Sequence, residues 1–401
     1  MMVARAHEDG YRELEETFAE RFGRDDPASS VHVSPTSADE VVLVARIAAR
    51  HELPLYLRGA GTAAGATADG GVSLRFELMR DVSVRENGEP VVDLGPGIPW
   101  IELEDRLQEN GRSLRVYPTS APHTTAGGWL ARDGLGVGSY EFGWLSENVV
   151  SAEVVLPGGA RETVSGETLD LVVGAEGTTG IIVEATLRLR EASRDTPFAA
   201  VFGDAGDLAR ATAALAEKRL PLWHLGFADP ALLLSGKPRR GQMLFGAHAG
   251  ERGGETGADL GRLISEHRGE LLATAEAYRA WGARFFPAGA HYDVPSPAHV
   301  LVPVAGLAQA LPGLKAEAGD LVVQGTIARD GESLITAFRA EGGGGLETPF
   351  EQDVKTLLAV ARRAGGREYA VGVRRYTGAR RDALVRLQKE VDPQGILGAG
   401  R

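Results

Sequence analysis

The chain has 401 residues, which is enough for two or three domains of ordinary size. It contains no cysteine, which excludes disulfide bonds, thiolate ligands for metals or iron–sulfur clusters, and a cysteine nucleophile. Its 43 Lys and Arg residues against 55 Asp and Glu residues give a net charge of −12, so we expect no nucleic-acid partner. No apolar run is long enough for a transmembrane segment and the first residues lack a secretory pattern, so we expect a cytoplasmic protein.

The first half of the chain mixes helical and strand periodicities. Apolar positions at helical spacing behind a Ser and an Asp predict a helix over 37–52, and strict alternation predicts a strand over 72–78. The other elements expected in this half are strands over 53–57, 90–94, 149–156 and 183–190 and a helix over 100–110. This order predicts an α+β domain over 1–194, with two lobes that meet near residue 90.

The second half of the chain predicts a separate layer of strands and helices. The expected strands cover 198–203, 222–228, 242–248, 299–303, 320–327 and 332–339, and the expected helices cover 207–218, 257–281, 304–316 and 351–364. They predict an antiparallel sheet layered with helices that covers the first domain as a cap. A strand over 369–373 and an amphipathic helix that ends at Asp392-Pro393 are expected to follow. The sequence shows no internal repeat.

Glycine is concentrated in three segments, 58–71, 127–143 and 174–180, each beside an apolar strand-like run. Any single glycine also fits an ordinary turn, but three dense clusters favour backbone that must approach a ligand closely. Gly59, Gly61 and Gly65 are spaced like a dinucleotide fingerprint, yet a strand follows them where a nicotinamide site needs a helix. The alternative is a loop of backbone N–H groups that holds a pyrophosphate.

The second glycine segment, 127–143, contains six glycines in seventeen residues. This density predicts neither a stable helix nor a stable strand. It is typical of backbone that lies flat against a large planar group. The third segment, Gly174-Ala-Glu-Gly-Thr-Thr-Gly180, runs directly into the strand predicted over 183–190.

In this order, the strings RGAGTAAG, PTSAPHTTAGGWLARDGLG and GAEGTTGIIVEATLRL resemble the FAD-binding domain of the vanillyl-alcohol oxidase / p-cresol methylhydroxylase family. Within this family, the sequence is most similar to the branch of the glycolate oxidase FAD subunit and D-lactate dehydrogenase. The resemblance implies FAD as the cofactor and a set of residues that contact it. The implied pyrophosphate loop consists of Arg58, Gly59, Ala60, Gly61, Thr62, Ala63 and Gly65. The implied flavin-side residues are Pro118, Thr119, His123, Thr125, Ala126, Gly127, Gly128, Ala131, Arg132 and Gly134. The implied second-lobe residues are Glu176, Gly177, Gly180, Ile181, Ile182 and Val183.

The resemblance also implies that FAD is held without a covalent bond. Many relatives tether it through a histidine at the end of an Arg-Ser-Gly-Gly-His string, and Thr62 stands at that position here. A hydroxyl can hydrogen-bond a phosphate oxygen, but it cannot replace the attacking imidazole nitrogen. The cysteine that tethers FAD in other relatives is absent as well.

The sequence departs from this branch in two places. Gly398-Ala399-Gly400 stands where the branch ends in Asn-Pro-Gly. The histidine-rich metal motif of the branch is missing, because its nearest counterpart, 245–250, carries one histidine and is typical of the end of a strand. We therefore expect no metal site.

The resemblance to this branch implies oxidation of a 2-hydroxy acid. This reaction needs a cation for the carboxylate and a base for the hydroxyl proton. The string Trp281-Gly-Ala-Arg284 resembles the Trp-x-x-Arg cap segment of the branch, which makes Arg284 the first candidate for the cation. The alternative is a surface arginine at a helix end. Arg374 belongs to a second polar cluster, for which a solvated turn is the alternative. The candidates for the base stay open and are His291, Tyr292, Tyr376 and His123.

These observations predict an α+β protein with a two-lobed FAD domain over 1–194 and a ferredoxin-like cap over 195–345. Residues 346–401 are expected to finish the cap and return to the FAD domain. The expected function is oxidation of a small 2-hydroxy acid such as glycolate or lactate, with hydride transfer to flavin N5. The alternatives are a sugar-alcohol or lactone oxidase and a non-catalytic FAD-binding subunit of a glycolate-oxidising complex. Any iron–sulfur electron acceptor must belong to a partner subunit.

Overall fold

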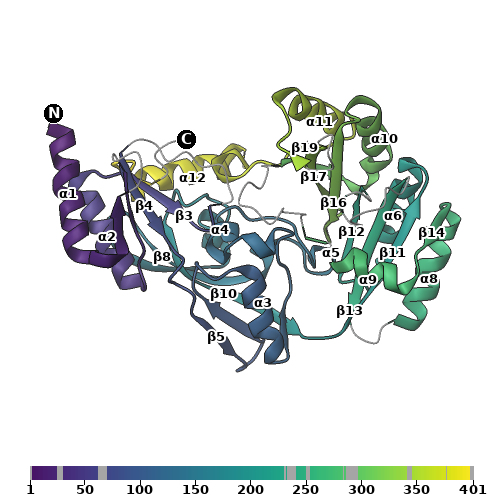
Figure 1. The fold of residues 1–401 in the computed structure, drawn as a ribbon, viewed down its shortest axis with the longest axis horizontal. Helices are drawn as coiled ribbons and strands as arrows, with labels where there is room; N and C mark the ends of the chain where they lie inside the picture. Colours follow the sequence, from purple (N-terminus) through teal and green to yellow (C-terminus); the bar gives the residue numbers. More distant parts are fainter. Residues whose placement is uncertain are drawn as a thin grey trace.

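The computed structural model describes residues 2–24, 30–61, 70–229, 232, 241–249, 253–282, 284–285, 297–340, 346–375 and 377–397. Two domains of mixed helices and strands lie side by side (Figure 1). The N-terminal domain holds a four-stranded and a six-stranded sheet, and the C-terminal domain, the cap, holds a nine-stranded sheet. This architecture confirms the predicted α+β class. No helix among these residues is long and apolar enough to cross a membrane.

The first sheet belongs to the N-terminal lobe, and its order is β1-β2-β4-β3. Its strands are β1 (Phe22–Arg24), β2 (Ser30–Val33), β4 (Gly71–Arg75) and β3 (Leu55–Arg58). Helices α1 (Met2–Phe18) and α2 (Ala38–His51) pack on it through a shared apolar core. The helix predicted over 37–52 is confirmed as α2, because the Ser37 side chain accepts a hydrogen bond from the Glu40 amide and caps its first turn. No sequence pattern had predicted α1.

The second sheet is antiparallel and has the order β5-β6-β10-β8-β9, with β7 beside β10. Its strands are β5 (Val82–Arg85), β6 (Val91–Leu94), β7 (Arg112–Leu114), β8 (Val149–Val155), β9 (Arg161–Ser165) and β10 (Ile181–Glu191). The chain leaves the first sheet at Arg75 and enters the second at Val82, so the lobes divide before residue 90. Helix α3 (Trp100–Glu109) is fixed to β7 because the buried Glu104 carboxylate accepts hydrogen bonds from Ser113 Oγ (2.7 Å) and the Leu114 amide (2.9 Å).

The cap sheet consists of two topologically equivalent halves that meet at β12 and β16. Each half runs strand, helix, strand, strand, helix, strand, and its strands are ordered fourth, first, third, second across the sheet. The first half is β11 (Asp195–Phe202), α6 (Ala205–Lys218), β12 (His224–Ala228), β13 (Gln242–Ala249), α8 (Gly253–Glu266) and β14 (Gly269–Leu271). The second half is β15 (Ala298–Pro303), α10 (Leu307–Glu317), β16 (Leu321–Ile327), β17 (Glu332–Ala340), α11 (Glu351–Arg363) and β19 (Arg367–Glu368). The cap is therefore two ferredoxin-like units that no repeat in the sequence had revealed.

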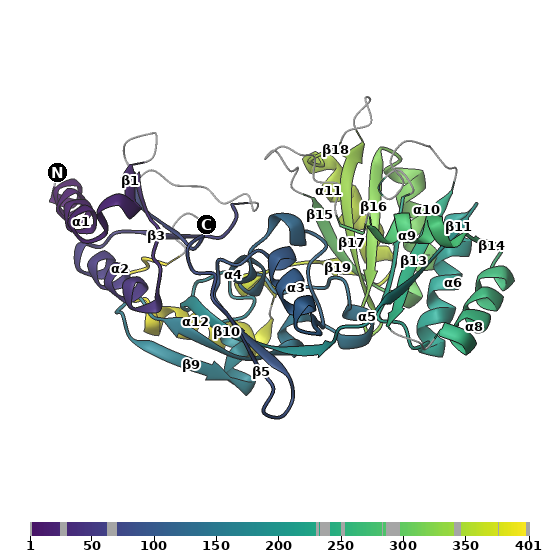
Figure 2. The ribbon, with the colours of Figure 1, turned by 60° about the horizontal axis from the view of Figure 1, so that its bottom comes forward.

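The two faces of the cap sheet have different neighbours. Helices α6, α8, α10 and α11 cover one face and share its apolar core, and Figure 2 shows α6 and α8 on the side away from the N-terminal domain. The other face packs with α9 (Thr274–Gly282) against the N-terminal domain. Trp223, Phe245 and Trp281 of the cap belong to the same apolar cluster as Val92 and Leu130. The domains thus share a core, and the residues between them are positioned by both.

Two predictions about secondary structure are wrong. Segment 127–143 does contain helical turns, α4 (Ala126–Leu130) and α5 (Ser139–Phe142). The strand predicted over 369–373 is absent, because β19 ends at Glu368 and Gly372–Arg375 forms a 3-10 turn. The Gly372 amide donates to the Gly174 carbonyl (2.9 Å), so this segment bonds to the N-terminal domain and adds no strand residues to the cap sheet.

The C-terminal helix forms as predicted. Helix α12 (Gly378–Val391) crosses back over the N-terminal domain (Figure 1) and ends at Asp392. The Asp392 carboxylate accepts hydrogen bonds from the amides of Ile396 (2.9 Å) and Leu397 (2.7 Å). The Leu55 amide then donates to the Ile396 carbonyl (2.7 Å), which brings the end of the chain to β3.

His224 makes the cap sensitive to acid. Its side chain is 1% exposed between Phe245 and Trp281, and its Nδ1 has no hydrogen-bond partner among the described residues. Burial, with a smaller effect of the Arg284 charge, lowers the pKa of His224 to about 3. Below pH ~6.5, the unfolded chain therefore binds a proton at His224 that the folded protein does not bind.

Between pH ~6.5 and pH ~5, we expect the free energy of unfolding of the wild type to fall by about 2 kcal/mol more than that of His224→Leu. The stabilising effect of the neutral imidazole is complete above the unfolded pKa and declines as the pH falls below it. Urea unfolding at the two pH values measures this difference. Equal losses in the two proteins would contradict the assignment.

Candidate functional site

The loop after β3 lies against the beginning of α4. A Cβ atom at Gly59 would stand 2.4 Å from Thr125 Oγ1 and 3.5 Å from the Gly128 Cα, so only glycine fits there. Thr125 Oγ1 is buried and has no hydrogen-bond partner among the described residues. Gly61 has a φ of 72°, in the left-handed region. Closely approaching backbone beside an unsatisfied buried hydroxyl fits a ligand with phosphate oxygens.

The second and third glycine segments are joined by backbone hydrogen bonds. The Gly174 amide donates to the Leu130 carbonyl (2.9 Å), and the Glu176 amide donates to the Ala131 carbonyl (2.7 Å). All three glycine segments therefore meet. The first segment contacts Gly128 of the second, and the third segment bonds to Leu130 and Ala131 of the second. Their convergence forms one surface from distant parts of the chain.

The predicted cofactor residues differ in exposure. Arg58, Ala60 and Gly61 are exposed, His123 is half-buried in a short 3-10 turn, and Arg132 is half-buried. The side chains of Ile181, Ile182 and Val183 lie in the apolar cores, so only their backbone could contact a ligand. Thr62, Ala63 and Gly65 lie outside the described residues, as do His291, Tyr292 and Tyr376.

Asp133, in the second glycine segment, holds a fully buried carboxylate at 0% exposure. The carboxylate accepts hydrogen bonds from the amides of Gly134 (2.8 Å) and Ser146 (2.9 Å) and from Ser146 Oγ (2.8 Å). It also forms an ion pair with Arg375, and the Asp133 carbonyl accepts a hydrogen bond from the Tyr369 hydroxyl. These contacts fasten segment 369–375 to the flavin-side segment. The neighbouring Arg374, one of the predicted catalytic residues, is exposed.

The cap sheet presents a row of polar side chains on its face toward the N-terminal domain. Gln324, Thr336 and His299 are direct cross-strand partners on β16, β17 and β15. His299 Nδ1 lies 3.1 Å from Thr336 Oγ1, and its ring packs edge-on against Tyr369 (5.6 Å between centroids). Burial and the nearby Arg132 charge lower the pKa of His299 to about 4, so the imidazole is neutral near pH 7.

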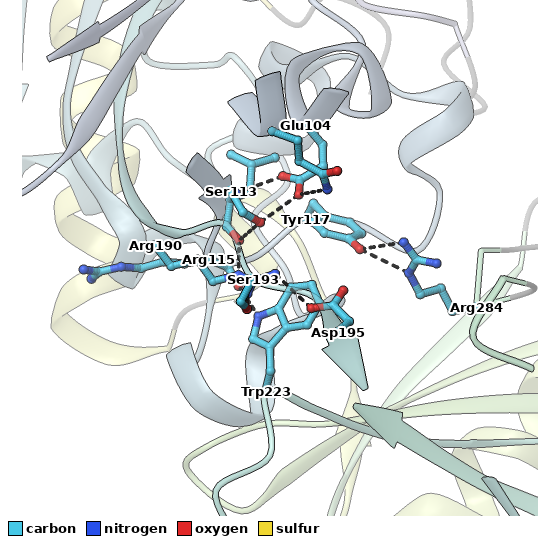
Figure 3. Close-up of polar contacts among 11 residues, drawn as sticks. Glu104, Ser113, Arg115, Tyr117, Arg190, Ser193, Asp195, Trp223 and Arg284 are labelled. Atoms are coloured by element: carbon cyan, nitrogen blue, oxygen red, sulfur yellow. Dashed lines mark hydrogen bonds and ion pairs between the residues drawn. The ribbon is translucent and has the colours of Figure 1, made fainter. Parts of the chain in front are cut away.

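Arg284 lies at the junction between the two domains (Figure 3). Its Nε and Nη2 donate to the Tyr117 hydroxyl at 3.1 and 2.9 Å, and its Nη1 donates to the Trp281 carbonyl at 2.8 Å. The guanidinium carbon lies 4.4 Å from the Trp281 ring centroid and 4.3 Å from that of Phe285. The Gln324 side chain holds the Arg284 carbonyl (3.0 Å). Within the described part of the chain, Arg284 forms no ion pair with a carboxylate.

Sequence reasoning missed four residues of this region, namely Tyr117, Asp133, His299 and Tyr369. Tyr117 directly precedes the recognised Pro118-Thr119 string, and Asp133 lies inside the recognised flavin-side segment, so position was an available signal for both. His299 had none, because a lone histidine in an apolar strand is typical of a core.

Comparison with known proteins agrees with this arrangement. Residues 29–165 match the family of FAD binding domains. Over 205 residues the chain is 31% identical to a D-lactate dehydrogenase of Archaeoglobus fulgidus, which covers 48% of this chain and 46% of that protein. Over 169 residues it is 27% identical to a glycolate oxidase subunit of Bacillus subtilis, which covers 39% of this chain and 36% of that protein. The chain matches less than half the length of these relatives.

Solved structures extend the fold match to the whole chain. An alkyldihydroxyacetonephosphate synthase superposes with a TM-score of 0.77 at 18% identity, over 98% of this chain and 84% of that one. A p-cresol methylhydroxylase superposes with a TM-score of 0.74 at 15% identity, over 99% and 96%. Residues 29–165 thus belong to the family of FAD binding domains, and the chain has the fold of p-cresol methylhydroxylase. FAD is thus its cofactor, and the glycine loop with Thr125 fits the phosphate oxygens of that cofactor.

The close approach at Gly59 leads to a prediction about FAD affinity. Gly59→Ala places a methyl group against Thr125 and Gly128, so we expect FAD affinity to fall about tenfold or more, which is ~1.4 kcal/mol. Gly158→Ala is the matched control, because a Cβ there meets nothing within 4 Å. Titration of the FAD-free proteins with FAD measures both affinities. Unchanged binding by Gly59→Ala would refute the role of this loop.

The Asp133 ion pair leads to a prediction about stability. Arg375→Met leaves the buried Asp133 carboxylate without its cation, so we expect a loss of roughly 3–5 kcal/mol in the free energy of unfolding. The exposed neighbour Arg374→Met should change it by no more than about 0.5 kcal/mol. Urea unfolding compares the two variants. Equal stabilities would show that Arg375 does not fasten the cap.

Proposed function

We propose that the protein is an FAD-dependent oxidoreductase that oxidises a small 2-hydroxy acid, such as glycolate or lactate. The observation that carries this proposal is the Arg284 guanidinium, which lies between the domains with a phenol and a carbonyl as its acceptors. A half-buried cation in that state favours an anionic ligand, and a guanidinium suits a carboxylate. The relatives named as a D-lactate dehydrogenase and a glycolate oxidase subunit support the same substrate class.

FAD, when bound, would supply the acceptor for the hydride from the carbon that bears the hydroxyl group. Arg284 holds the carboxylate and thereby orients that carbon. The hydroxyl proton passes to a base on the protein, and His123, His291, Tyr292 and Tyr376 stay the candidates from the sequence. Arg374 stays a second candidate for binding the acid. A partner subunit that accepts electrons and a cytoplasmic location also stay predictions.

Two other functions would need different side chains or a different reactivity at the same domain junction. A sugar-alcohol or lactone oxidase needs polar groups and no cation for a carboxylate, which leaves Arg284 without a role. A non-catalytic subunit would bind FAD and show no reduction by any hydroxy acid when purified alone. The geometry at Arg284 favours the hydroxy acid, and the experiments below separate the three.

Removal of the Arg284 charge tests the proposal. We expect Arg284→Met to weaken the apparent affinity for the acid by roughly 2–5 kcal/mol, about 30-fold to several thousandfold, with unchanged FAD content. Arg279→Met is the matched control, since Arg279 is an exposed arginine on α9, directly before the Arg284 segment. Flavin reduction at increasing acid concentrations measures the affinity. Wild-type affinity in Arg284→Met would overturn the carboxylate role.

We also expect FAD to be bound without a covalent link, because Thr62 and the absence of cysteine remove both tethers of the relatives. Acid denaturation of the yellow protein should therefore release the flavin into the supernatant after centrifugation. Flavin that stays with the washed pellet would refute the prediction.

A further inference from the structure

The hydrogen bonds of Arg284 leave part of its guanidinium without an acceptor among the described residues. A guanidinium has five N–H groups. Tyr117 Oη accepts one from Nε and one from Nη2, and the Trp281 carbonyl accepts one from Nη1. Toward the described residues, one N–H of Nη1 and one of Nη2 remain. Figure 3 shows the third nitrogen pointing away from the Tyr117 ring.

We propose that Tyr117 is a positioning residue that turns the Nη1–Nη2 end of Arg284 toward the substrate carboxylate. This inference rests on the proposed function. A carboxylate binds best when two N–H groups meet its two oxygens side by side. Two hydrogen bonds to one hydroxyl oxygen fix the rotation of the guanidinium within its own plane. The Trp281 and Phe285 rings, at 4.4 and 4.3 Å, pack against it and restrict its tilt.

A phenol suits this role because it accepts hydrogen bonds without carrying charge. Tyr117 is 2% exposed, and its burial raises its pKa to about 12, so it is neutral at physiological pH. A carboxylate at the same place would neutralise Arg284 and compete with the substrate. The contrast is Arg375, whose cation is paired with the Asp133 carboxylate and serves the attachment of the cap. Tyr117 orients its arginine without neutralising it, and the nearby Asp195 carboxylate forms its ion pair with Arg190 (3.5 Å).

Tyr117 is itself held by the N-terminal domain. Its amide and carbonyl form a two-way bridge with Val137, at 3.1 and 2.8 Å. A Cβ at Gly136 would stand 2.1 Å from the Tyr117 carbonyl oxygen, so the two segments are in close contact. The ring packs edge-on against Trp223 (5.9 Å). The pair therefore sets the position of a cap arginine relative to the segment that begins at Pro118, on the flavin side.

The test is Tyr117→Phe in the FAD-loaded protein, with Tyr140→Phe as the control. Tyr140 is also buried, at 9% exposure, but its hydroxyl donates to the Leu215 carbonyl (3.1 Å) in the helical core of the cap. We expect Tyr117→Phe to raise the KM for the acid roughly ten- to hundredfold, with kcat and FAD content within about twofold of the wild type. Tyr140→Phe should leave KM unchanged. A parallel fall of kcat and FAD content would indicate a merely structural role and overturn the proposal.

A second measurement does not depend on turnover. Oxalate, a dicarboxylate without an oxidisable hydrogen, is titrated into the oxidised proteins while the flavin spectrum is recorded. We expect Tyr117→Phe to weaken oxalate binding by the same factor, and to have no further effect in the Arg284→Met background. An equal effect in both backgrounds would overturn the proposal.

The two measurements separate this inference from the proposed function. If the wild type binds oxalate and no hydroxy acid reduces it, the proposed function fails and Tyr117 is still judged by oxalate affinity. If the wild type is reduced and Tyr117→Phe has wild-type KM and oxalate affinity, only the inference fails. If oxalate does not bind the wild type, the KM of Tyr117→Phe against that of Tyr140→Phe decides the inference, and flavin reduction decides the proposed function.

Discussion

The buried carboxylate of Asp133 joins two parts of the chain that are far apart in the sequence, residues 133–146 and Arg375. A fully buried charge is costly unless donors and a cation surround it. Asp133 receives both, from Gly134 and Ser146 within the N-terminal domain and from Arg375 in the segment that follows the cap sheet. These contacts fix the glycine-rich segment around Asp133 against Ser146 and Arg375. The same contact therefore joins the segment after the cap sheet to the second glycine segment.

The junction between the domains contains two arginines whose surroundings differ in kind. Arg375 is paired with a carboxylate, so its charge is already compensated and its effect is on stability. Arg284 is oriented by the neutral Tyr117 phenol and the Trp281 carbonyl, and neither acceptor carries a charge. Burial alone does not distinguish these cases, since both side chains are partly covered. The charge of the acceptor does distinguish them, because only Arg375 is paired with a carboxylate.

The sequence was informative where the signal is local. The periodicity of α2 and β10 is a property of short stretches, and these elements followed from it. FAD followed from the resemblance of three glycine-rich strings to a known FAD-binding domain. The contacts that build the junction are not local. Tyr117 and Arg284 are 167 positions apart, and Arg375 and Asp133 are 242 apart, so no spacing rule connects them. The two halves of the cap share a topology and no visible sequence repeat, which hid their duplication. Near Gly372, strand-like alternation was overridden by docking on Gly174.

The most direct test of the account is anaerobic mixing of the purified, FAD-loaded protein with a panel of small hydroxy acids and polyols. Glycolate, the two lactate enantiomers and a polyol without a carboxylate are compared at equal concentrations. We expect at least one hydroxy acid to abolish the visible flavin absorbance and the polyol to leave it unchanged. Absorbance that persists with every acid, or disappears only with the polyol, would contradict it.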